Sequence, residues 1–433
     1  MNQDWFIGDL HIHSRFSRAC STNLNFENLV KWAKIKGVNL LGTGDFTHPL
    51  WLKEIKEKLK FVPASDFKEN QPEGKLREEK GFYYYNDFPF IITGEISLIY
   101  TQESPVGTNF TSKIRKGRRI HLVVLVPNLE VADKINSYLD TKGRRDYDGR
   151  PIFNISGEEF VKQMMEISFD IEIIPAHIWT PWFGLFGSAS GFDSLKECFK
   201  EQIKNIHAIE TGMSSDPEMN WRISELEDKA IISFSDAHSF WPFRLGREAT
   251  IFKKADSYSE LIRQIRNKDF IATIETEPAY GKYHYDGHRN CNFSCSPEKS
   301  KELNGICPVC KKPLTIGVDN RVEQLANYKK GYRIENAKPF YKLLPLHEIL
   351  ALALGSSLES KTVWSVYNSL IGEFGNEFEI LLNIPREEFT RKNIDDKIIE
   401  LIMRNRNEKI KVTPGYDGEY GKAMLGEKQI TLT

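Results

Sequence analysis

Long hydrophobic runs are missing from this 433-residue chain, and no apolar stretch approaches the roughly 18 residues that a membrane span requires. The first residues also lack the basic-then-apolar pattern of a secretory signal, so we expect no membrane partner and a cytoplasmic location. The net charge is also small, because 59 basic and 60 acidic residues leave a formal charge of −1. A nucleic-acid partner would therefore have to be bound by local basic patches.

Cysteine is the next scarce residue. The chain has six, and four of them lie between Cys291 and Cys310. In a chain without an export signal, this clustering favours a metal site over disulfides. The hydrophobic content of 40% and the charged content of 27% are typical of a globular protein, and the length is sufficient for two or three domains.

Seven short apolar segments, each with polar or ionisable residues at one end, dominate the first half of the chain. Most are nearly continuous in apolar residues, which is typical of strands buried on both faces. The segments are 6–10 followed by His11 and His13, 38–44 by Asp45, 90–94 by Glu95, 121–126 beginning with His121, 171–176 followed by His177, 206–209 by Glu210, and 231–235 by Asp236 and His238.

Helical patterns separate several of these segments. Alternating strands and helices predict a parallel α/β sheet or barrel, in which active sites lie at the carboxyl ends of the strands. Six of the seven segments have their polar residues at that end, and His121 is the exception. The predicted helices are 26–36, 50–59, 131–139, 158–167, 195–203 and 218–228.

The pair His11 and His13 has the spacing of two ligands for one ion, because residues two apart on a strand point to the same side. The pair alone is weak evidence, and its weight comes from the polar residues that end the other segments. A mixture of imidazole and carboxylate ligands suits zinc, manganese or iron. Ions of this kind activate water and neutralise phosphoryl oxygens, so the sequence predicts a metal-dependent phosphoesterase.

The segment 179–193 follows His177 and is rich in aromatic residues and glycine, which predicts a loop over the metal centre. Its aromatic side chains either form a satellite hydrophobic cluster or stack against bases. Asp193 begins an apparent helix, so an N-cap is its ordinary role, and a catalytic or substrate-orienting role is the alternative. The aromatic residues are Trp179, Trp182, Phe183 and Phe186.

A basic run at 113–119 is the first candidate for binding a nucleic-acid backbone. Such runs are usually solvated surface, but cations around a flexible glycine beside a phosphoesterase favour phosphate binding. The candidate residues are Arg115, Lys116, Arg118 and Arg119.

The cysteines Cys291, Cys295, Cys307 and Cys310 are separated by three, eleven and two residues. Four thiolates leave no open coordination position, so the spacing predicts one structural zinc ion, with a redox pair as the alternative. Such an ion would stabilise a subdomain whose hydrophobic core is too small for it to fold without the metal.

Helical spacing returns at 343–354, 361–374 and 394–402, followed by a loop at 411–421 that is rich in glycine and tyrosine. The loop is either ordered surface or a platform on which Tyr416 and Tyr420 contact a base.

Five motifs resemble the polymerase-and-histidinol-phosphatase (PHP) metallophosphoesterases: His11-x-His13, the segment 43–48, Gly94-Glu95-Ile96, Ala176-His177 and Asp236-x-His238. The resemblance implies an α/β fold, a distorted (β/α)7 TIM-like barrel over residues 1–280, with two or three divalent ions (zinc, manganese or magnesium). It implies one ion among His11, His13, Glu95 and Asp236, a second held by Glu95, His121 and His177, and a third by Asp45 or His48 with His238.

Two departures from the PHP pattern bear on the third ion. Arg18, Ala19 and Cys20 stand where many PHP domains have a His or Asp, and Phe46 replaces the usual His after Asp45. Occupancy of the third position is therefore left open.

The whole chain, with its cysteine module and its tail, resembles the endonuclease Q family. That resemblance implies a DNA-repair endonuclease that cuts on the 5′ side of deaminated bases (uracil, hypoxanthine, xanthine) or abasic sites. Our candidate catalytic residues are Asp193, because it follows closely after His177, together with Asp236 and Glu95. The resemblance also implies a barrel (1–280), a zinc module (281–320) and a helical C-terminal domain (321–433), with lesion-containing DNA as the partner and a sliding clamp as a further candidate. The alternatives are a phosphatase of small esters such as histidinol phosphate, or a non-catalytic DNA-binding scaffold.

Overall fold

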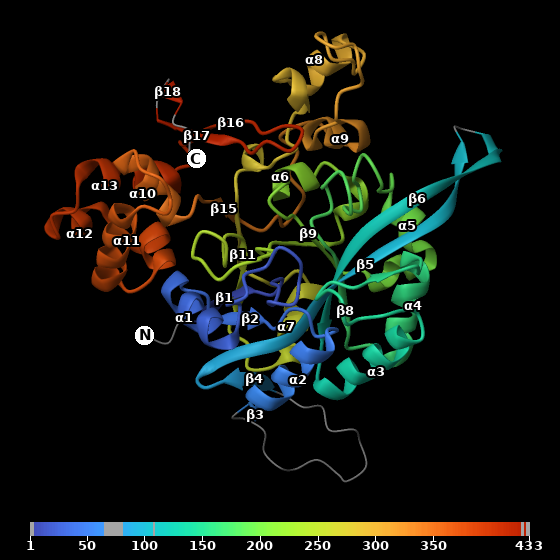
Figure 1. Cartoon of the computed structure of the whole chain (residues 1–433), viewed down its shortest axis with the longest axis horizontal. Helices are drawn as coiled ribbons and strands as arrows, with labels where there is room; N and C mark the ends of the chain where they lie inside the picture. Colours follow the sequence, from blue (N-terminus) through green and yellow to red (C-terminus); the bar gives the residue numbers. More distant parts are fainter. Residues whose placement is uncertain (1–3, 65–80, 107–108, 426–427, 430–433) are drawn as a thin grey trace.

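A large mixed sheet forms the centre of the molecule (Figure 1). The computed structural model describes residues 4–64, 81–106, 109–425 and 428–429. The sheet has the strand order β15-β12-β11-β1-β2-β5-β4-β3, with β6 and β7 paired to β5 and with β8 paired to β6. The strands are β1 (Trp5–Asp9), β2 (Leu40–Gly42), β3 (Lys60–Pro63), β4 (Gly81–Tyr85), β5 (Phe88–Val106), β6 (Asn109–Val126), β7 (Ile152–Phe153), β8 (Glu172–Pro175), β11 (Ala249–Lys253), β12 (Ala272–Glu275) and β15 (Phe340–Lys342).

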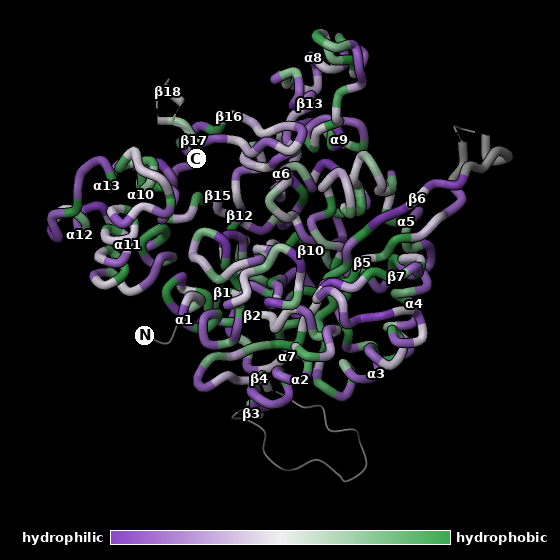
Figure 2. Tube along the Cα trace, viewed as in Figure 1, coloured by the Kyte–Doolittle hydropathy of each residue, from purple (hydrophilic) through white to green (hydrophobic). Residues whose placement is uncertain are grey.

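A separate parallel pair, β9 (Ala208–Glu210) and β10 (Ala230–Ile232), lies beside this sheet. All seven apolar segments predicted as strands contain strands, namely β1, β2, β5, β6, β8, β9 and β10. Figure 2 shows hydrophobic residues concentrated along the central strands and hydrophilic residues on the outer turns. The core of the molecule is therefore formed by these strands and the helices that cover them.

The direction of β6 explains why His121 begins its segment when the other polar residues end theirs. β6 runs antiparallel to both β5 and β8, so the start of its apolar half lies at the edge where the other strands end. Ser97 pairs with His121 and Glu95 with Val123, which places Glu95 and His121 on one face of the sheet. The sheet is consequently mixed, not purely parallel as predicted.

Four of the six helices predicted between the strands are present over nearly their full length, and side-chain caps define where several begin. Asn25, Asn128 and Ser156 each accept a hydrogen bond from a backbone N–H three residues later, the role for which such residues are preferred. These helices are α1 (Phe26–Lys36), α2 (Pro49–Lys58), α3 (Leu129–Asp140) and α4 (Gly157–Ile167), with α7 (Tyr258–Arg266) further along the chain.

Two predicted helices are shorter than expected. In the segment 195–203 the α-helix α5 spans only Leu195–Phe199, because the positive φ of 46° at Lys200 ends it, and a 3-10 helix at Lys200–Asn205 follows. The helix predicted at 218–228 was wrong, because only α6 (Pro217–Asn220) and a single 3-10 turn form there. The carbonyl of Arg222 accepts hydrogen bonds from the backbone of Asn327 and Tyr328, which holds the chain outside a helical path.

After β12, the chain forms a small unit and then a helical unit. The small unit contains β13 (Asp286–His288), β14 (Phe293–Cys295), α8 (Pro297–Glu302) and α9 (Val318–Leu325). The helical unit contains α10 (Leu346–Leu354), α11 (Lys361–Phe374), α12 (Arg386–Arg391) and α13 (Asp396–Arg406), and it lies next to α1 in Figure 1. The buried Lys36 of α1 and Glu377 join the two through an ion pair of 2.6 Å.

Three short strands, β16 (Lys411–Thr413), β17 (Lys422–Leu425) and β18 (Lys428–Gln429), end the described chain. Among the described helices, none combines the length and apolar character that crossing a membrane demands.

Candidate metal centre

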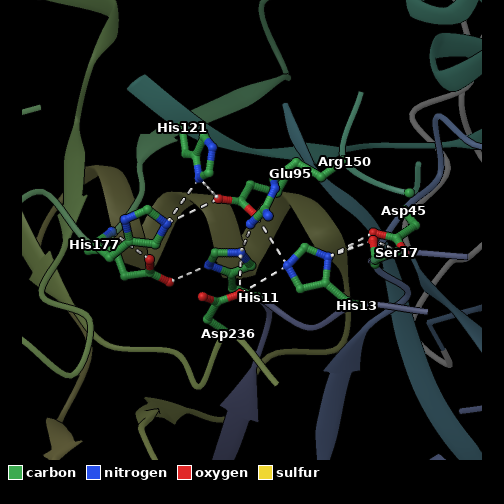
Figure 3. A network of polar contacts seen from close by, with 12 residues as sticks. His11, His13, Ser17, Asp45, Glu95, His121, Arg150, His177 and Asp236 are labelled. Atoms are coloured by element: carbon green, nitrogen blue, oxygen red, sulfur yellow. Dashed lines mark hydrogen bonds and ion pairs between the residues drawn. The ribbon is translucent and has the colours of Figure 1, made fainter. Parts of the chain in front are cut away.

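The carboxylate of Glu95 is the centre of the site, and each of its oxygens faces a different set of ligands (Figure 3). Glu95 Oε2 lies 3.4 Å from Nε2 of His11 and 3.1 Å from Nε2 of His13. Asp236 Oδ1 completes this group at 2.9 Å from His13 Nε2 and 3.5 Å from His11 Nε2. These four side chains present two imidazole nitrogens and two carboxylate oxygens to one point, which is a ligand set for a divalent ion.

The second group uses the other oxygen of the same carboxylate. Glu95 Oε1 lies 2.6 Å from Nδ1 of His121 and 3.1 Å from Nε2 of His177. The two imidazole nitrogens are 3.3 Å apart. Glu95 is thus placed to bridge two neighbouring ions, the arrangement that paired-ion phosphoesterases use.

Hydrogen bonds behind three of the imidazoles leave Nε2 of each ring directed at the centre. His13 Nδ1 lies 3.0 Å from Asp45 Oδ1, and His177 Nδ1 lies 3.0 Å from the hydroxyl of Thr180. His11 Nδ1 lies 2.8 Å from Glu210 Oε1, and its buried Nε2 has no hydrogen-bond partner. Partners of this kind fix the tautomer and orient the ring for metal binding.

Glu210 was not assigned to the site from the sequence, although it ends one of the predicted strands. It is fully buried, and its second oxygen accepts a hydrogen bond of 2.8 Å from the backbone N–H of His177. One carboxylate therefore positions a residue of each ligand group. Its place at the end of β9 was the signal that could have identified it.

Backbone strain accompanies three residues of the centre that follow strand ends. Asp45, His177 and Asp236 follow β2, β8 and β10, and each has a positive φ, of 45°, 32° and 49° respectively. Left-handed conformations cost a non-glycine residue about 1 kcal/mol or more and cluster at functional sites. The turn before Asp45 is also tightly packed, because a Cβ on Gly44 would lie 2.4 Å from the carbonyl oxygen of Ile12.

The electrostatics of the centre favour a bound cation. Burial alone would lower the pKa of His11, but the carboxylates of Glu210, Asp236 and Glu95 outweigh it and raise that pKa well above its usual value. Burial opposes ionisation of Glu95, but the guanidinium of Arg150 and the nearby imidazoles hold its pKa well below the usual range. Ionised carboxylates buried around imidazole nitrogens form a cage with strong affinity for positive charge.

The residues expected around a third ion do not form a ligand group among the described residues. Asp45 lies behind His13, and its other oxygen accepts hydrogen bonds of 2.6 Å from both the N–H and the hydroxyl of Ser14. The ring of His48 stacks against Phe16 at 4.3 Å, and Nδ1 of His238 bonds the carbonyl of Asp236. In this structure Asp45 orients the ring of His13 through the contact with Nδ1, and its expected role as a ligand of a third ion stays a prediction.

The cysteine region contains a third ligand group whose membership differs from the prediction. His288, Cys291, Cys307 and Cys310 bring one nitrogen and three sulfur atoms together. Nδ1 of His288 lies 3.1 Å from Sγ of Cys291 and 3.3 Å from Sγ of Cys310. Cys295, which ends β14 opposite Asp286, is not a member of this group, although it packs in the same small cluster as Cys307.

The aromatic loop after His177 divides into buried and exposed residues. Trp179 and Phe186 are fully buried, and Trp179 Nε1 donates to Asn220, so neither can stack on a base as expected. Phe183 packs on His121 with ring centroids 4.4 Å apart, which places the loop against the metal centre. Trp182 is 41% exposed and packs edge-on against Tyr283 of the small unit.

Two of the other predicted site residues have internal partners. Asp193 forms an ion pair of 2.6 Å with Arg321 and belongs to neither of the two ligand groups that contain Glu95, while Ser194 is the N-cap of α5. Arg118 is buried over Phe192 and bonds the carbonyl of Gly191, so it holds the loop and is not free to bind a phosphate.

The remaining predicted DNA-binding residues are accessible to different degrees. Arg115, Lys116 and Arg119 are exposed along β6. Tyr420 is 46% exposed beneath Lys282, whereas Tyr416 is half-buried and donates to Asn292 at 2.9 Å.

Comparison with known proteins places this geometry in a family. A family model described as the MJ0043 C-terminal domain matches residues 345–409, the segment that forms the helical unit. The uncharacterized protein MJ0043 of Methanocaldococcus jannaschii is 34% identical over 297 residues, which cover 66% of this chain and 36% of MJ0043. The chain thus matches about a third of that relative's length. The uncharacterized protein YqxK of Bacillus subtilis is 26% identical over 91% of this chain and 90% of YqxK.

Two solved structures are similar over nearly the whole chain. The lesion-specific endonuclease PfuEndoQ from Pyrococcus furiosus has a TM-score of 0.81 and 29% identity, covering 98% of this chain and 96% of the other. Endonuclease Q in complex with a 27-mer duplex substrate, with an abasic lesion at the active site, has a TM-score of 0.81 and 30% identity over 98% of this chain and 97% of the other. The chain belongs to the endonuclease Q family.

Proposed function

We propose that this protein is a DNA-repair endonuclease that hydrolyses the phosphodiester on the 5′ side of a deaminated base or an abasic site. The observation that carries the proposal is the pair of ligand groups that share Glu95, within a chain whose relative binds a duplex with an abasic lesion at its active site. A paired-ion centre suits phosphodiester hydrolysis because both the attacking and the leaving oxygens need stabilisation.

The residues of the centre fit two divalent ions, which would be held by His11, His13, Glu95 and Asp236 and by Glu95, His121 and His177. Such ions supply activated water and neutralise the phosphoryl oxygens. Asp236 is the most exposed of these ligands, with 32% of its side chain accessible, so it marks the side from which DNA approaches. Attack on phosphorus breaks the P–O3′ bond and leaves a 3′-hydroxyl and a 5′-phosphate.

Exposed aromatic residues beside the centre support recognition of an extruded base. Trp182 packs on Tyr283, and Phe183 of the same loop packs on His121. An enzyme that judges a base must remove it from the stack, at a cost of about a few kcal/mol, and aromatic side chains offset part of that cost. We propose that Trp182 and Tyr420 contact the DNA bases and that Arg115, Lys116 and Arg119 contact its backbone.

The cysteine region is proposed to hold one structural zinc ion through His288, Cys291, Cys307 and Cys310. Three thiolates and one imidazole form a closed tetrahedral site of the kind that stabilises small domains. Cys295 would then be a buried thiol beside this site. The ion would stabilise the small unit whose core consists of few residues.

A distorted barrel is the arrangement that we propose for the seven predicted strands. In this arrangement the pair β9–β10 lies between β8 and β1. The backbone N–H of Ile178 donates to the backbone carbonyl of Glu210, and Ile12 forms an isolated parallel β-bridge with Ala237. We also propose that residues 1–280 form this barrel, 281–320 the zinc module and 321–433 the helical domain, although Phe340–Lys342 adds the strand β15 to the barrel sheet. The cytoplasmic location and a sliding-clamp partner stay predictions.

The test uses end-labelled duplexes that carry uracil, hypoxanthine, an abasic site or no lesion, with manganese or magnesium added. We expect one nick 5′ of each lesion and none in the undamaged duplex. Equal cutting of all duplexes, or of none, would contradict the proposal. Turnover of histidinol phosphate without nicking would instead favour a small-molecule phosphatase, and the variant Asp236→Asn controls for a contaminating nuclease.

A further inference from the structure

Arg150 reaches the metal centre from a loop that lies outside all of the sequence motifs. Its Nη1 atom lies 3.0 Å from Oε2 of Glu95, and only 25% of its side chain is exposed. Figure 3 shows the guanidinium beside Glu95. Because the side chain is mostly buried against a ligand carboxylate, it differs from the solvated arginines of the basic run.

The backbone around Arg150 is held from both sides. The carboxylate of Asp148 accepts a hydrogen bond from the backbone N–H of Arg150. The backbone N–H of Gly149 donates to the backbone carbonyl of Phe16. On the other side, the carbonyl of Pro151 accepts from Ser97 of β5, at 3.0 Å. These contacts fix the direction in which the side chain leaves the loop.

The loop also closes the corner where a third ion would lie. A Cβ atom on Gly149 would lie 2.1 Å from Oδ2 of Asp45, so the loop is packed directly on that carboxylate. Asp45 Oδ2 also accepts from Ser17 at 2.8 Å, in addition to its bonds with Ser14. The ring of His48 stacks on the ring of Phe16. Among the described residues, Asp45, His48 and His238 therefore form no ligand group for a third ion.

We propose that the barrel binds two ions and that the guanidinium of Arg150 takes the place of the third. In this arrangement Arg150 donates hydrogen bonds to a non-bridging oxygen of the scissile phosphate. It offsets the negative charge that develops as water attacks phosphorus and the P–O3′ bond breaks. Arginine suits this role because its planar fork matches phosphate oxygens and always carries its charge. The inference rests on the proposed phosphodiesterase function and adds a catalytic residue to it.

The first test counts ions and does not depend on activity. The full chain is saturated with manganese in the barrel and with zinc in the cysteine region, and its metal content is measured after removal of free ions. We expect two manganese ions per chain in the wild type. Three manganese ions per chain would overturn the proposal, because the third position would then be occupied by a metal.

The second test follows phosphodiester cleavage by Arg150→Ala, Arg150→Lys and the control Arg391→Ala, whose exposed side chain lies on α12. We expect Arg150→Ala to lower kcat by about 10²–10³-fold with KM nearly unchanged, the range found when one transition-state donor is removed. Arg150→Lys should retain intermediate activity. Added guanidinium ion should restore part of the Arg150→Ala activity, which a purely structural role would not allow.

An unchanged kcat for Arg150→Ala, or a low kcat without rescue by guanidinium, would overturn the assignment. Bis(4-nitrophenyl) phosphate serves as a second substrate and separates the two proposals. If the wild type hydrolyses this diester but no lesion duplex, the proposed DNA function fails, while the Arg150 inference is still decided by the variants and by the ion count.

Discussion

Glu210 holds the imidazole of His11 through a contact of 2.8 Å between Oε1 and Nδ1, at the end of a strand that carries no direct ligand. The same carboxylate accepts the backbone N–H of His177, so it connects the two ligand groups. This connection makes the geometry of both groups dependent on one buried side chain. The protein contains a second pair of this kind, Glu172 with His207, at the opposite end of β8, where no ligand lies.

Replacing Glu210 by Gln should weaken manganese binding by roughly 10- to 100-fold, the range for residues that orient a metal ligand. The amide can accept from His177 only by turning its NH2 group toward His11, which favours the tautomer with a proton on Nε2. Competition with a chelator measures the affinity. Glu172→Gln is the matched control, since it alters a Glu–His pair away from the ligands, and equal losses in the two variants would contradict the positioning role.

Asp236→Asn should abolish nicking while the protein remains folded. The neutral amide removes charge from the cage and replaces the oxygen that lies 2.9 Å from His13 Nε2. Replacing a direct ligand should lower activity by more than roughly 100-fold, the upper limit for replacing a residue that only orients a ligand. Single-turnover cleavage and thermal melting check the two parts, with the exposed Asp87→Asn as control. Wild-type cleavage by Asp236→Asn would remove this residue from the site.

Cys307→Ser and His288→Ala should each release the zinc ion and lower the melting temperature, whereas Cys295→Ser should keep the ion. The reason is that His288 and Cys307 belong to the closed ligand group and Cys295 does not. Zinc content per chain and a melting curve measure the effects. Loss of zinc from Cys295→Ser with retention in His288→Ala would show that the four cysteines bind the ion.

Trp182→Ala and Trp179→Ala should separate binding from stability, although the two residues are close in sequence. Trp179 is fully buried, and truncating it should cost about 3–5 kcal/mol of unfolding free energy. Trp182 is 41% exposed, so its loss should weaken binding of a lesion duplex, by about 1–3 kcal/mol if it stacks on a base, with little change in unfolding. Denaturant unfolding and DNA titration measure the two effects. A Trp182→Ala protein with wild-type DNA affinity would exclude the stacking role.

Stability should fall as pH rises from about 5 to 9, because burial raises the pKa of Glu275 from 4.5 to about 8. A group whose pKa is raised by folding stabilises the protein below its unfolded pKa, and that contribution is lost as pH rises through the folded pKa. The neighbouring buried Glu248, whose pKa is also raised by burial, adds in the same direction. Glu275→Gln resembles the protonated form and should flatten the decline in melting temperature over this range. An identical decline in the variant and in the wild type would assign the effect elsewhere, and the exposed Glu130→Gln serves as control.

The sequence by itself determined the strand segments and most of the ligands. His11, His13, Glu95, His177 and Asp236 could be predicted because each ends or follows a short apolar run. The ends of neighbouring strands meet at one edge of a sheet, so local periodicity was sufficient to bring these side chains together.

Only the tertiary structure decided the rest of the site. The antiparallel direction of β6 brings His121 to the ligand edge, and strand direction depends on pairing between distant segments. Arg150 enters from a loop whose partner Glu95 is 55 residues away in the chain, so no spacing pattern marks it. Glu210 ends a predicted strand and His288 lies three residues before Cys291, but only the folded chain shows what each of them contacts. The aromatic loop has no periodicity that separates the buried Trp179 from the exposed Trp182, because burial there depends on which other elements cover the loop.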